Sequence, residues 1–403
     1  MRKILVVVLI MILLSQASDL LVNLHGAAHA EGIPFTASNP QNGVGPESVK
    51  DALSVLFINV GEADAILLRY DGKAFLIDTG DKASVPGLFG ALNLFGVDRL
   101  NGVFLTHTHA DHLGGLEALA RHYGIDMLYS AVFSINKKNG KNKIEELARE
   151  LSLPLRKLRT GERVPFSNNI SFHVLGPVVF NAEDDNDNSL VLKVDAFGRS
   201  LLFVGDMQFP GEDALLRSGA ELDADVLKVG NHGNPDATSE QFADAVSPWA
   251  AVISTDRLED SDSANERVIA ALRSAHVFIT ENFTCGVLVT VGADGSIRAS
   301  NPKPPAALEG VSLAGINRNA QTVTVTNDGP DADISGVMIL SWRGSEVFLF
   351  PKGALLQSGQ SVSVSSKPGA DYTWPDETKV WHQEKDDSAF LYDRFGNFLS
   401  RWD

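Results

Sequence analysis

The chain has 403 residues, of which 44% are hydrophobic and 21% are charged, and this composition is typical of folded globular proteins and excludes a disordered chain. The length is sufficient for two or three domains. The formal net charge of −17 argues against a general electrostatic grip on nucleic acid, but it leaves a nuclease open, because bound metal ions supply local positive charge.

The N-terminal residues have the pattern of a secretory signal peptide. Arg2 and Lys3 precede an unbroken apolar run over residues 4–14, and Ala28 and Ala30 fit a small-x-small cleavage site. The run is short for a membrane span, so an uncleaved anchor is the less favoured alternative. We predict a signal peptide over residues 1–30, a linker over 31–51, a secreted or extracytoplasmic location, and no transmembrane segment in the mature chain.

Strand and helix patterns alternate between residues 52 and 300. Strand patterns occur at residues 55–60, 65–70, 74–77, 103–106, 170–175, 190–194, 201–204 and 251–254. Helical periodicity occurs at residues 88–95, 113–123, 143–151 and 264–274. This order predicts an α/β domain of sheets covered by helices. Cys285 is the single cysteine and lies in a strand-like run, so we predict a buried, inert thiol and no intramolecular disulfide.

The composition changes near residues 301–307, where a double proline follows a polar turn and indicates a linker. Beyond it, the helical pattern vanishes and short strands are expected at residues 321–326, 336–342, 346–350 and 361–365. Residues 308–403 therefore predict a small all-β sandwich.

The segment from His107 to His112 contains three imidazoles and a carboxylate within six positions. It follows an apolar strand and precedes Gly114 and Gly115. Such a mixture of nitrogen and oxygen ligands suits divalent metals. The spacing allows His107 and His109 to serve one metal ion while Asp111 and His112 serve its neighbour.

Three further polar residues stand at the ends of apolar strands. They are Asp78, Asp206 and His232. Several polar residues on one rim of a sheet are a common way to build a functional site, although an Asp in this position can also simply cap a turn.

The order Asp78-x-Gly80, His107-x-His109-x-Asp111-His112, Gly205-Asp206 and then His232 resembles the metallo-β-lactamase superfamily of metal-dependent hydrolases. The likeness covers roughly residues 52–300 and implies an αββα sandwich. Residues 57–65, 186–192 and 227–233 are most similar to the extracytoplasmic hydrolase domain of bacterial competence DNA-uptake channels and its secreted relatives.

The resemblance implies two divalent ions, Zn²⁺ or alternatively Mn²⁺. It implies that His107 and His109 hold the first ion, that Asp111, His112 and His232 hold the second, and that Asp206 bridges them. Asp78 would brace the ligand loop by a hydrogen bond without touching metal. Asp111 would also orient the attacking hydroxide.

Four residues near the implied centre, which depart from the family pattern or have an open role, are predicted to bind substrate. Asn188 and Ser189 stand where other branches place a third histidine for the first metal. Asn231 replaces the first histidine of a His-His pair, and we favour His232 as the ligand. Lys228 either approaches a substrate phosphate or points outward from its strand. A Gly-His-Pro expected after the last core strand is also missing from this sequence.

Residues 308–403 resemble the lamin tail domain, an immunoglobulin-like module, through the steps at residues 334–337, 348–351 and 389–396. The resemblance implies a role in adhesion, in substrate presentation or in spacing, and the fold does not choose among them. Attachment to the cell envelope through this domain is one form that adhesion would take.

The leading functional hypothesis is a secreted phosphodiesterase or nuclease that uses a hydroxide activated by two metals, with nucleic acid as a candidate substrate. The alternatives are an esterase for cell-envelope phosphodiesters of the phosphorylcholine type, and a catalytically weakened binding protein presented by the C-terminal domain. A β-lactamase is disfavoured because residues 186–189 lack the histidine that such enzymes use.

Overall fold

The computed structural model describes residues 51–135, 140–375 and 379–403. The predicted signal peptide and residues 31–50 of the predicted linker lie outside these ranges. No helix within the described ranges combines the length and the apolarity that crossing a membrane requires.

The first large sheet has eight strands, which are β1 (Ala52–Ile58), β2 (Ile66–Tyr70), β3 (Lys73–Ile77), β5 (Gly102–Leu105), β7 (Leu128–Ala131), β8 (Leu155–Leu158), β16 (Gly286–Gly292) and β17 (Ile297–Ser300). Their order in the sheet is β17-β16-β1-β2-β3-β5-β7-β8. The apolar run of β1 is buried on both faces, as expected for a central strand between two packed layers.

The second large sheet has seven strands, which are β9 (Arg163–Pro165), β10 (Ser171–Gly176), β11 (Val191–Ala196), β12 (Arg199–Phe203), β13 (Val226–Lys228), β14 (Ala250–Ile253) and β15 (His276–Ile279). Their order is β15-β14-β13-β12-β11-β10-β9, and β12 to β15 run parallel. A separate pair joins β4 (Arg99–Leu100) to β6 (Gly124–Ile125).

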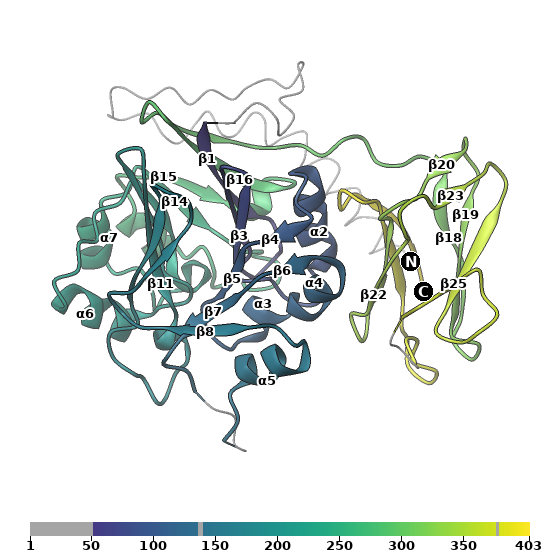
Figure 1. The fold of residues 1–403 in the computed structure, drawn as a ribbon, viewed down its shortest axis with the longest axis horizontal. Helices are drawn as coiled ribbons and strands as arrows, with labels where there is room; N and C mark the ends of the chain where they lie inside the picture. Colours follow the sequence, from purple (N-terminus) through teal and green to yellow (C-terminus); the bar gives the residue numbers. More distant parts are fainter. Residues whose placement is uncertain (1–50, 136–139, 376–378) are drawn as a thin grey trace. The chain divides into compact units, whose positions relative to one another are not determined.

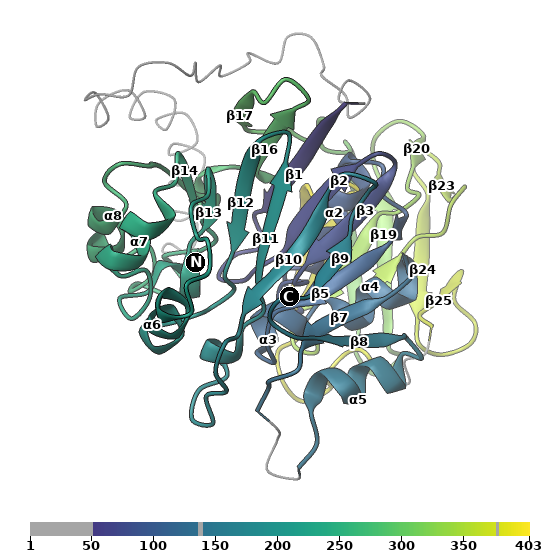
Figure 2. The same cartoon turned by 60° about the vertical axis from the view of Figure 1, so that its left-hand side comes forward.

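Helices cover the outer faces of both sheets. On the first sheet they are α2 (Val85–Leu94), α3 (Ala110–Leu113), α4 (Leu116–His122) and α5 (Lys143–Glu150), and on the second α6 (Phe209–Arg217), α7 (Glu240–Val246) and α8 (Glu266–Ala271). The single-turn elements are η2 (Asn186–Asn188), η3 (Gly230–Gly233) and η4 (Thr280–Asn282). Figures 1 and 2 show α6 and α7 on one side of the two sheets and α2 and α4 on the other.

Three apolar layers hold this arrangement together. Phe57, Phe104 and Phe203 belong to the core between the two sheets. Leu88 of α2 packs in a second core on the outer face of the first sheet, and Phe242 of α7 packs in a third on the outer face of the second. The predicted αββα sandwich is therefore confirmed.

The C-terminal part of the chain is built from strands, as predicted. One sheet has the order β18 (Val311–Asn317), β19 (Thr322–Asn327), β24 (Ser361–Ser365), β25 (Tyr372–Thr373), and the other has the order β22 (Val347–Leu349), β21 (Met338–Ser341), β26 (Ala389–Tyr392), β27 (Phe398–Trp402). A short pair joins β20 (Ala332–Asp333) to β23 (Leu355–Leu356). Trp374 and Trp381 are buried in the core of this part.

The element boundaries differ most from the prediction around glycine and proline. The single helix expected over residues 113–123 is interrupted at Gly114 and Gly115, between α3 and α4. A Cβ on Gly115 would lie 2.2 Å from the carbonyl oxygen of Thr79, so glycine is required for this close approach. Helix α2 begins three residues earlier than expected, because Pro86 suits the first turn of a helix.

Candidate metal centre

The candidate ligands meet where the strands of the two sheets end. His107 and His109 follow β5, Asp206 follows β12, and His232 lies in η3 shortly after β13. Strands β12 and β13 are parallel, so their carboxyl ends lie at the same edge of the sheet. Loops at this edge commonly carry the functional residues of open α/β sheets.

Three residues of the centre have backbone conformations that are uncommon for residues other than glycine. The φ angles of Asp78, Asn231 and His232 are 59°, 44° and 52°. Backbone hydrogen bonds hold these turns, including Asp78 N to the carbonyl of Phe104 at 2.8 Å and Asn231 N to the carbonyl of Gly205 at 3.3 Å. Such conformations concentrate at sites where function requires a specific side-chain direction.

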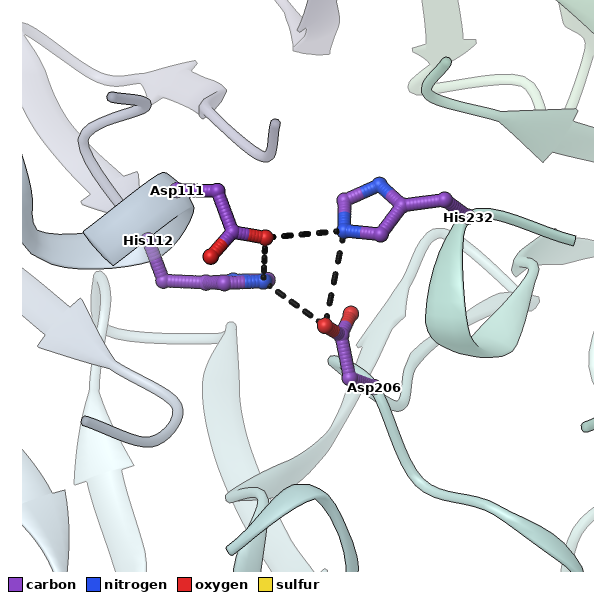
Figure 3. A group of neighbouring side chains, drawn as sticks. All are labelled: Asp111, His112, Asp206 and His232. Carbon is purple, nitrogen blue, oxygen red and sulfur yellow. Dashed lines mark hydrogen bonds and ion pairs between the residues drawn. The ribbon is translucent and has the colours of Figure 1, made fainter. Parts of the chain in front are cut away.

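One group of candidate ligands, which would hold the second ion and is termed metal site 2, consists of Asp111, His112, Asp206 and His232 (Figure 3). Their ligand atoms all lie within 4.8 Å of one another. The Nε2 atom of His112 is 2.9 Å from Asp206 Oδ2, and the Nε2 atom of His232 is 3.2 Å from Asp111 Oδ2. Two imidazoles and two carboxylates converging on one point match the ligands that zinc and manganese accept.

Another group, which would hold the first ion and is termed metal site 1, consists of His107, His109 and Asp206. Among the described residues, His107 Nε2 and Asp206 Oδ1 have no hydrogen-bond partner although both atoms are buried. Buried polar atoms without a partner are costly, so these two atoms fit a metal ion. Because Asp206 belongs to both groups, the residues fit a pair of ions that share one carboxylate.

Neighbouring groups fix the histidine rings of metal site 2 in one orientation. His232 Nδ1 donates to the carbonyl oxygen of Ser254 at 2.8 Å, and His112 Nδ1 donates to Asp78 Oδ2 at 2.8 Å. Asp78 is fully buried and also accepts hydrogen bonds from the backbone amide and hydroxyl of Thr106. Outer partners of this kind leave the opposite ring nitrogen free as a metal ligand.

The charges of the metal-free centre are strongly coupled. Burial lowers the pKa of His107 well below its ordinary value, and the nearby charge of His112 adds to the effect. Burial also opposes the charged forms of His112 and His232, but the carboxylate of Asp206 outweighs it, so both pKa values are raised well above the ordinary value. Burial likewise opposes ionisation of Asp206, yet the charges of the two histidines hold its pKa well below the usual range.

These shifts describe a centre that keeps its carboxylate ionised. In the metal-free protein two protonated histidines balance this negative charge. A divalent ion supplies the same positive charge, so it can take the place of these protons on the Nε2 atoms.

One family model matches the part of the chain that contains the candidate metal ligands. Residues 58–255 match the model of the Metallo-beta-lactamase superfamily, and this match includes β2, the ligand loop, Asp206 and His232. These residues form a metallo-β-lactamase domain.

The metallo-β-lactamase domain has relatives among competence proteins, as the sequence resemblance predicted. It is 28% identical to ComE operon protein 3 of Bacillus subtilis over 234 residues, which are 54% of this chain and 30% of that protein. It is also 28% identical to the competence protein ComA of Neisseria gonorrhoeae over 257 residues, which are 63% of this chain and 34% of that protein. The chain thus spans about a third of the length of these relatives.

The chain is also similar to a solved structure at low sequence identity. It is the metallo-beta-lactamase fold protein YhfI from Bacillus subtilis, with 13% identity and a TM-score of 0.42, and the match covers 60% of this chain and all of that one.

The structure separates the two residues of the Asn231-His232 pair in the metallo-β-lactamase domain. His232 is directed toward the centre, whereas the Asn231 amide donates to Asp236 Oδ1 at 2.8 Å. Asn231 therefore stabilises its own loop and leaves the ligand position to His232.

Asn188 and Ser189 have different surroundings in the metallo-β-lactamase domain. The Asn188 amide donates to the carbonyl of Asn181 and to Asp185, which makes it part of the loop scaffold. The Ser189 hydroxyl accepts a hydrogen bond from the backbone amide of Asp206 at 3.1 Å and lies 3.4 Å from His107 Nδ1. Ser189 thus lies beside metal site 1, on the Nδ1 side of the His107 ring.

The ammonium of Lys228 lies inside the domain. It pairs with Asp64 Oδ2 at 2.7 Å, and both side chains are 1% exposed. It also donates to the carbonyl of Val229. Asp64 Oδ1 lies 4.0 Å from His232 Nδ1, so the buried pair packs next to the side of the His232 ring that faces away from the metal site.

Sequence reasoning assigned no role to Asp64 or to the carbonyl of Ser254. The pairing of Asp64 depends on the approach of the loop between β1 and β2 to strand β13, which is distant in the chain, and a backbone carbonyl has no sequence signal. Cys285 is buried as predicted, and burial raises the pKa of its thiol to about 11.

Proposed function

We propose that this chain is a secreted, metal-dependent phosphodiesterase or nuclease that binds two divalent ions, Zn²⁺ or Mn²⁺. The observation that carries the proposal is the sharing of Asp206 by metal site 1 and metal site 2. When bound, a pair of ions lowers the pKa of a bridging water and stabilises charge on the oxygens of an attacked ester. The likeness to competence proteins supports nucleic acid as the substrate.

The protein groups have separate tasks in this proposal. With metal bound, His107 and His232 would present neutral Nε2 atoms as ligands, while their Nδ1 atoms face Thr106 and Ser254. Asp111 is a third exposed, so its carboxylate reaches the mouth of the centre while Oδ2 contacts both His112 and His232. From that position Asp111 would accept a hydrogen bond from the attacking hydroxide and orient it toward the phosphorus.

The first experiment measures metal content and cleavage together. We expect the purified chain to hold two ions after reconstitution and to cleave single-stranded DNA, RNA or bis(p-nitrophenyl) phosphate. Loss of an outer partner of a metal ligand costs up to about 100-fold. Asp206 would itself be a ligand of both ions, so Asp206→Asn should reduce cleavage by at least about this factor.

The matched control for this experiment is Asp71→Asn, which removes the same charge from an exposed turn. A chain that holds two ions and leaves all three substrates intact would disprove the phosphodiesterase. A chain that retains no stoichiometric metal would instead support the catalytically weakened binding protein.

A second candidate function is hydrolysis of a phosphorylcholine-type ester of the cell envelope. Acidic residues beside metal site 2 favour it, because they would attract the positively charged choline group. Glu62 is close enough to His232 and Asp260 for both charges to affect its pKa, which burial raises overall. Glu259 adjoins Asp256, and burial and that neighbour raise its pKa.

This candidate is tested with p-nitrophenylphosphorylcholine and choline-bearing teichoic acid. Preference for these esters over DNA, together with a KM that rises in Glu62→Gln, would select it. Equal rates on choline and ethyl esters would reject it.

The remaining parts of the proposal concern location. We propose that residues 1–30 direct export and that the lamin-tail-like residues 308–403 attach the hydrolase to the cell envelope. Fractionation of cells producing the full chain tests both, with a chain ending at residue 307 as the comparison. Recovery of both chains only in the cytoplasm would contradict export.

A further inference from the structure

A cavity of about 390 Å³ lies between α6 and the loop that follows β10. Most of its walls are apolar, and they include Pro177, Val178, Val179, Phe180, Met207 and Ala214. Clefts of this size and character are typical of sites for small organic groups. We call it the ring pocket.

The ring pocket adjoins metal site 1. Ser189 is among its lining residues, and its hydroxyl accepts a hydrogen bond from the amide of Asp206 and lies 3.4 Å from His107 Nδ1. Met207, another lining residue, directly follows Asp206 in the chain. A group held in the pocket thus lies near Asp206 and near the Nδ1 side of the His107 ring, two of the three residues that would hold the first ion.

The polar atoms of the pocket wall are largely used within the protein. Asp187 Oδ1 accepts hydrogen bonds from the backbone amides of Gln208 and Gly211, and Oδ2 accepts one from Asn181. A Cβ on Gly211 would lie 2.6 Å from Met207 Cγ and 2.9 Å from Asp187 Oδ1, so a larger residue there would displace these two lining side chains. The pocket therefore offers shape and apolar surface more than hydrogen bonds.

Two large apolar side chains remain exposed at this loop. Val179 is 61% exposed and Phe180 is 46% exposed. The ring of Phe180 also lies 5.9 Å from that of Phe133, which supports it from one side. An exposed phenyl ring at a pocket can stack on a flat ligand ring, as aromatic side chains do with nucleic acid bases.

We propose that the ring pocket binds the planar base of the nucleotide that is attached to the scissile phosphodiester on the side of metal site 1. This inference rests on the proposed phosphodiesterase function and adds the part of the substrate that is recognised. The apolar walls explain recognition of a ring without sequence preference, because every base offers a flat face.

The test uses two esters with the same leaving group, thymidine 5′-(p-nitrophenyl phosphate) and methyl p-nitrophenyl phosphate. The variant Ala214→Trp fills the pocket from α6. Its matched control is Ala245→Trp on an exposed position of α7. We expect Ala214→Trp to raise KM for the thymidine ester about 10-fold, since stacking of one base contributes on the order of that factor.

The methyl ester should be cleaved with unchanged KM in both variants. Hydrolysis of both esters with no change of KM in Ala214→Trp overturns the ring pocket and leaves the phosphodiesterase intact. If neither ester is cleaved, the phosphodiesterase fails, and equilibrium dialysis with thymidine decides the pocket separately. Retention by the unmodified chain and loss in Ala214→Trp supports it, and equal retention overturns it.

Discussion

Replacing Asp78 by Asn tests whether the buried carboxylate sets the metal affinity of the centre. Asp78 accepts hydrogen bonds from the Thr106 amide at 2.8 Å, the Thr106 hydroxyl at 2.7 Å and His112 Nδ1 at 2.8 Å. An amide has a single acceptor oxygen, so its NH₂ group must face one of these donors. If it faces His112, the ring must accept at Nδ1, and its proton then moves to Nε2, the atom that would hold the metal.

The size of the effect follows from the strength of the hydrogen bond between His112 and the carboxylate. A hydrogen bond to a charged acceptor contributes about 1.5–3 kcal/mol. Because 1.4 kcal/mol corresponds to about a factor of ten, removing this bond predicts a decrease in metal affinity of about 10- to 100-fold. The same range is typical when an outer partner of a metal-binding histidine is removed.

The assay is competition for zinc against a chromophoric chelator at neutral pH. We expect weaker binding at metal site 2 in Asp78→Asn and little change in Asp71→Asn. Asp71 is exposed, and its φ of 52° suits asparagine. Affinity within twofold of the unmodified chain, in a variant with an unchanged unfolding midpoint, would refute the role assigned to Asp78.

Three further predictions concern stability and reactivity. Lys228→Met leaves the Asp64 carboxylate buried and unpaired, so the free energy of unfolding in urea should fall by about 3–5 kcal/mol, and adding Asp64→Leu should restore much of it; a single variant as stable as the parent would contradict the buried pair. When a chelator keeps the protein metal-free, the raised pKa values of His112 and His232 stabilise the fold fully below about pH 6.5, and this contribution is lost as the pH rises. The lowered pKa of Asp206 stabilises the fold above about pH 3.8, and this contribution is lost as the pH falls below that value. Urea titrations of the metal-free protein should therefore show their maximum between these limits, and a steady increase from pH 6 to pH 9 would be inconsistent with the two protonated histidines. With its pKa raised to about 11, Cys285 should react slowly with a thiol reagent at pH 8 in the folded protein and rapidly in denaturant, and equal rates would show that the thiol is accessible.

Much of the centre could be predicted from the sequence because its ligands are concentrated in one loop. His107, His109, Asp111 and His112 lie within six consecutive positions after an apolar strand, and this density of ligands has a chemical meaning without any knowledge of the fold. Alternating strand and helix patterns also sufficed for the αββα layers, because periodicity reports which face of each element is buried.

Other features were beyond reach of local patterns. Helices α6 and α7 were not anticipated, because Pro210 and Gly211 weaken the helical pattern at the start of α6 and α7 has only seven residues. Helices α3 and α4, which lie on either side of Gly114 and Gly115, were predicted as one helix. The contact with Thr79 that requires glycine joins distant segments, so no local pattern indicates the break.

The sequence by itself determined the superfamily and the chemical type of the ligands, because both depend on residue identity and spacing within short segments. The tertiary structure decided which of Asn231 and His232 faces the centre, through two left-handed backbone conformations in η3. It also decided that Lys228 faces Asp64 and that a ring pocket adjoins metal site 1. These outcomes depend on the approach of strands and loops far apart in the chain, so residue order alone does not contain them.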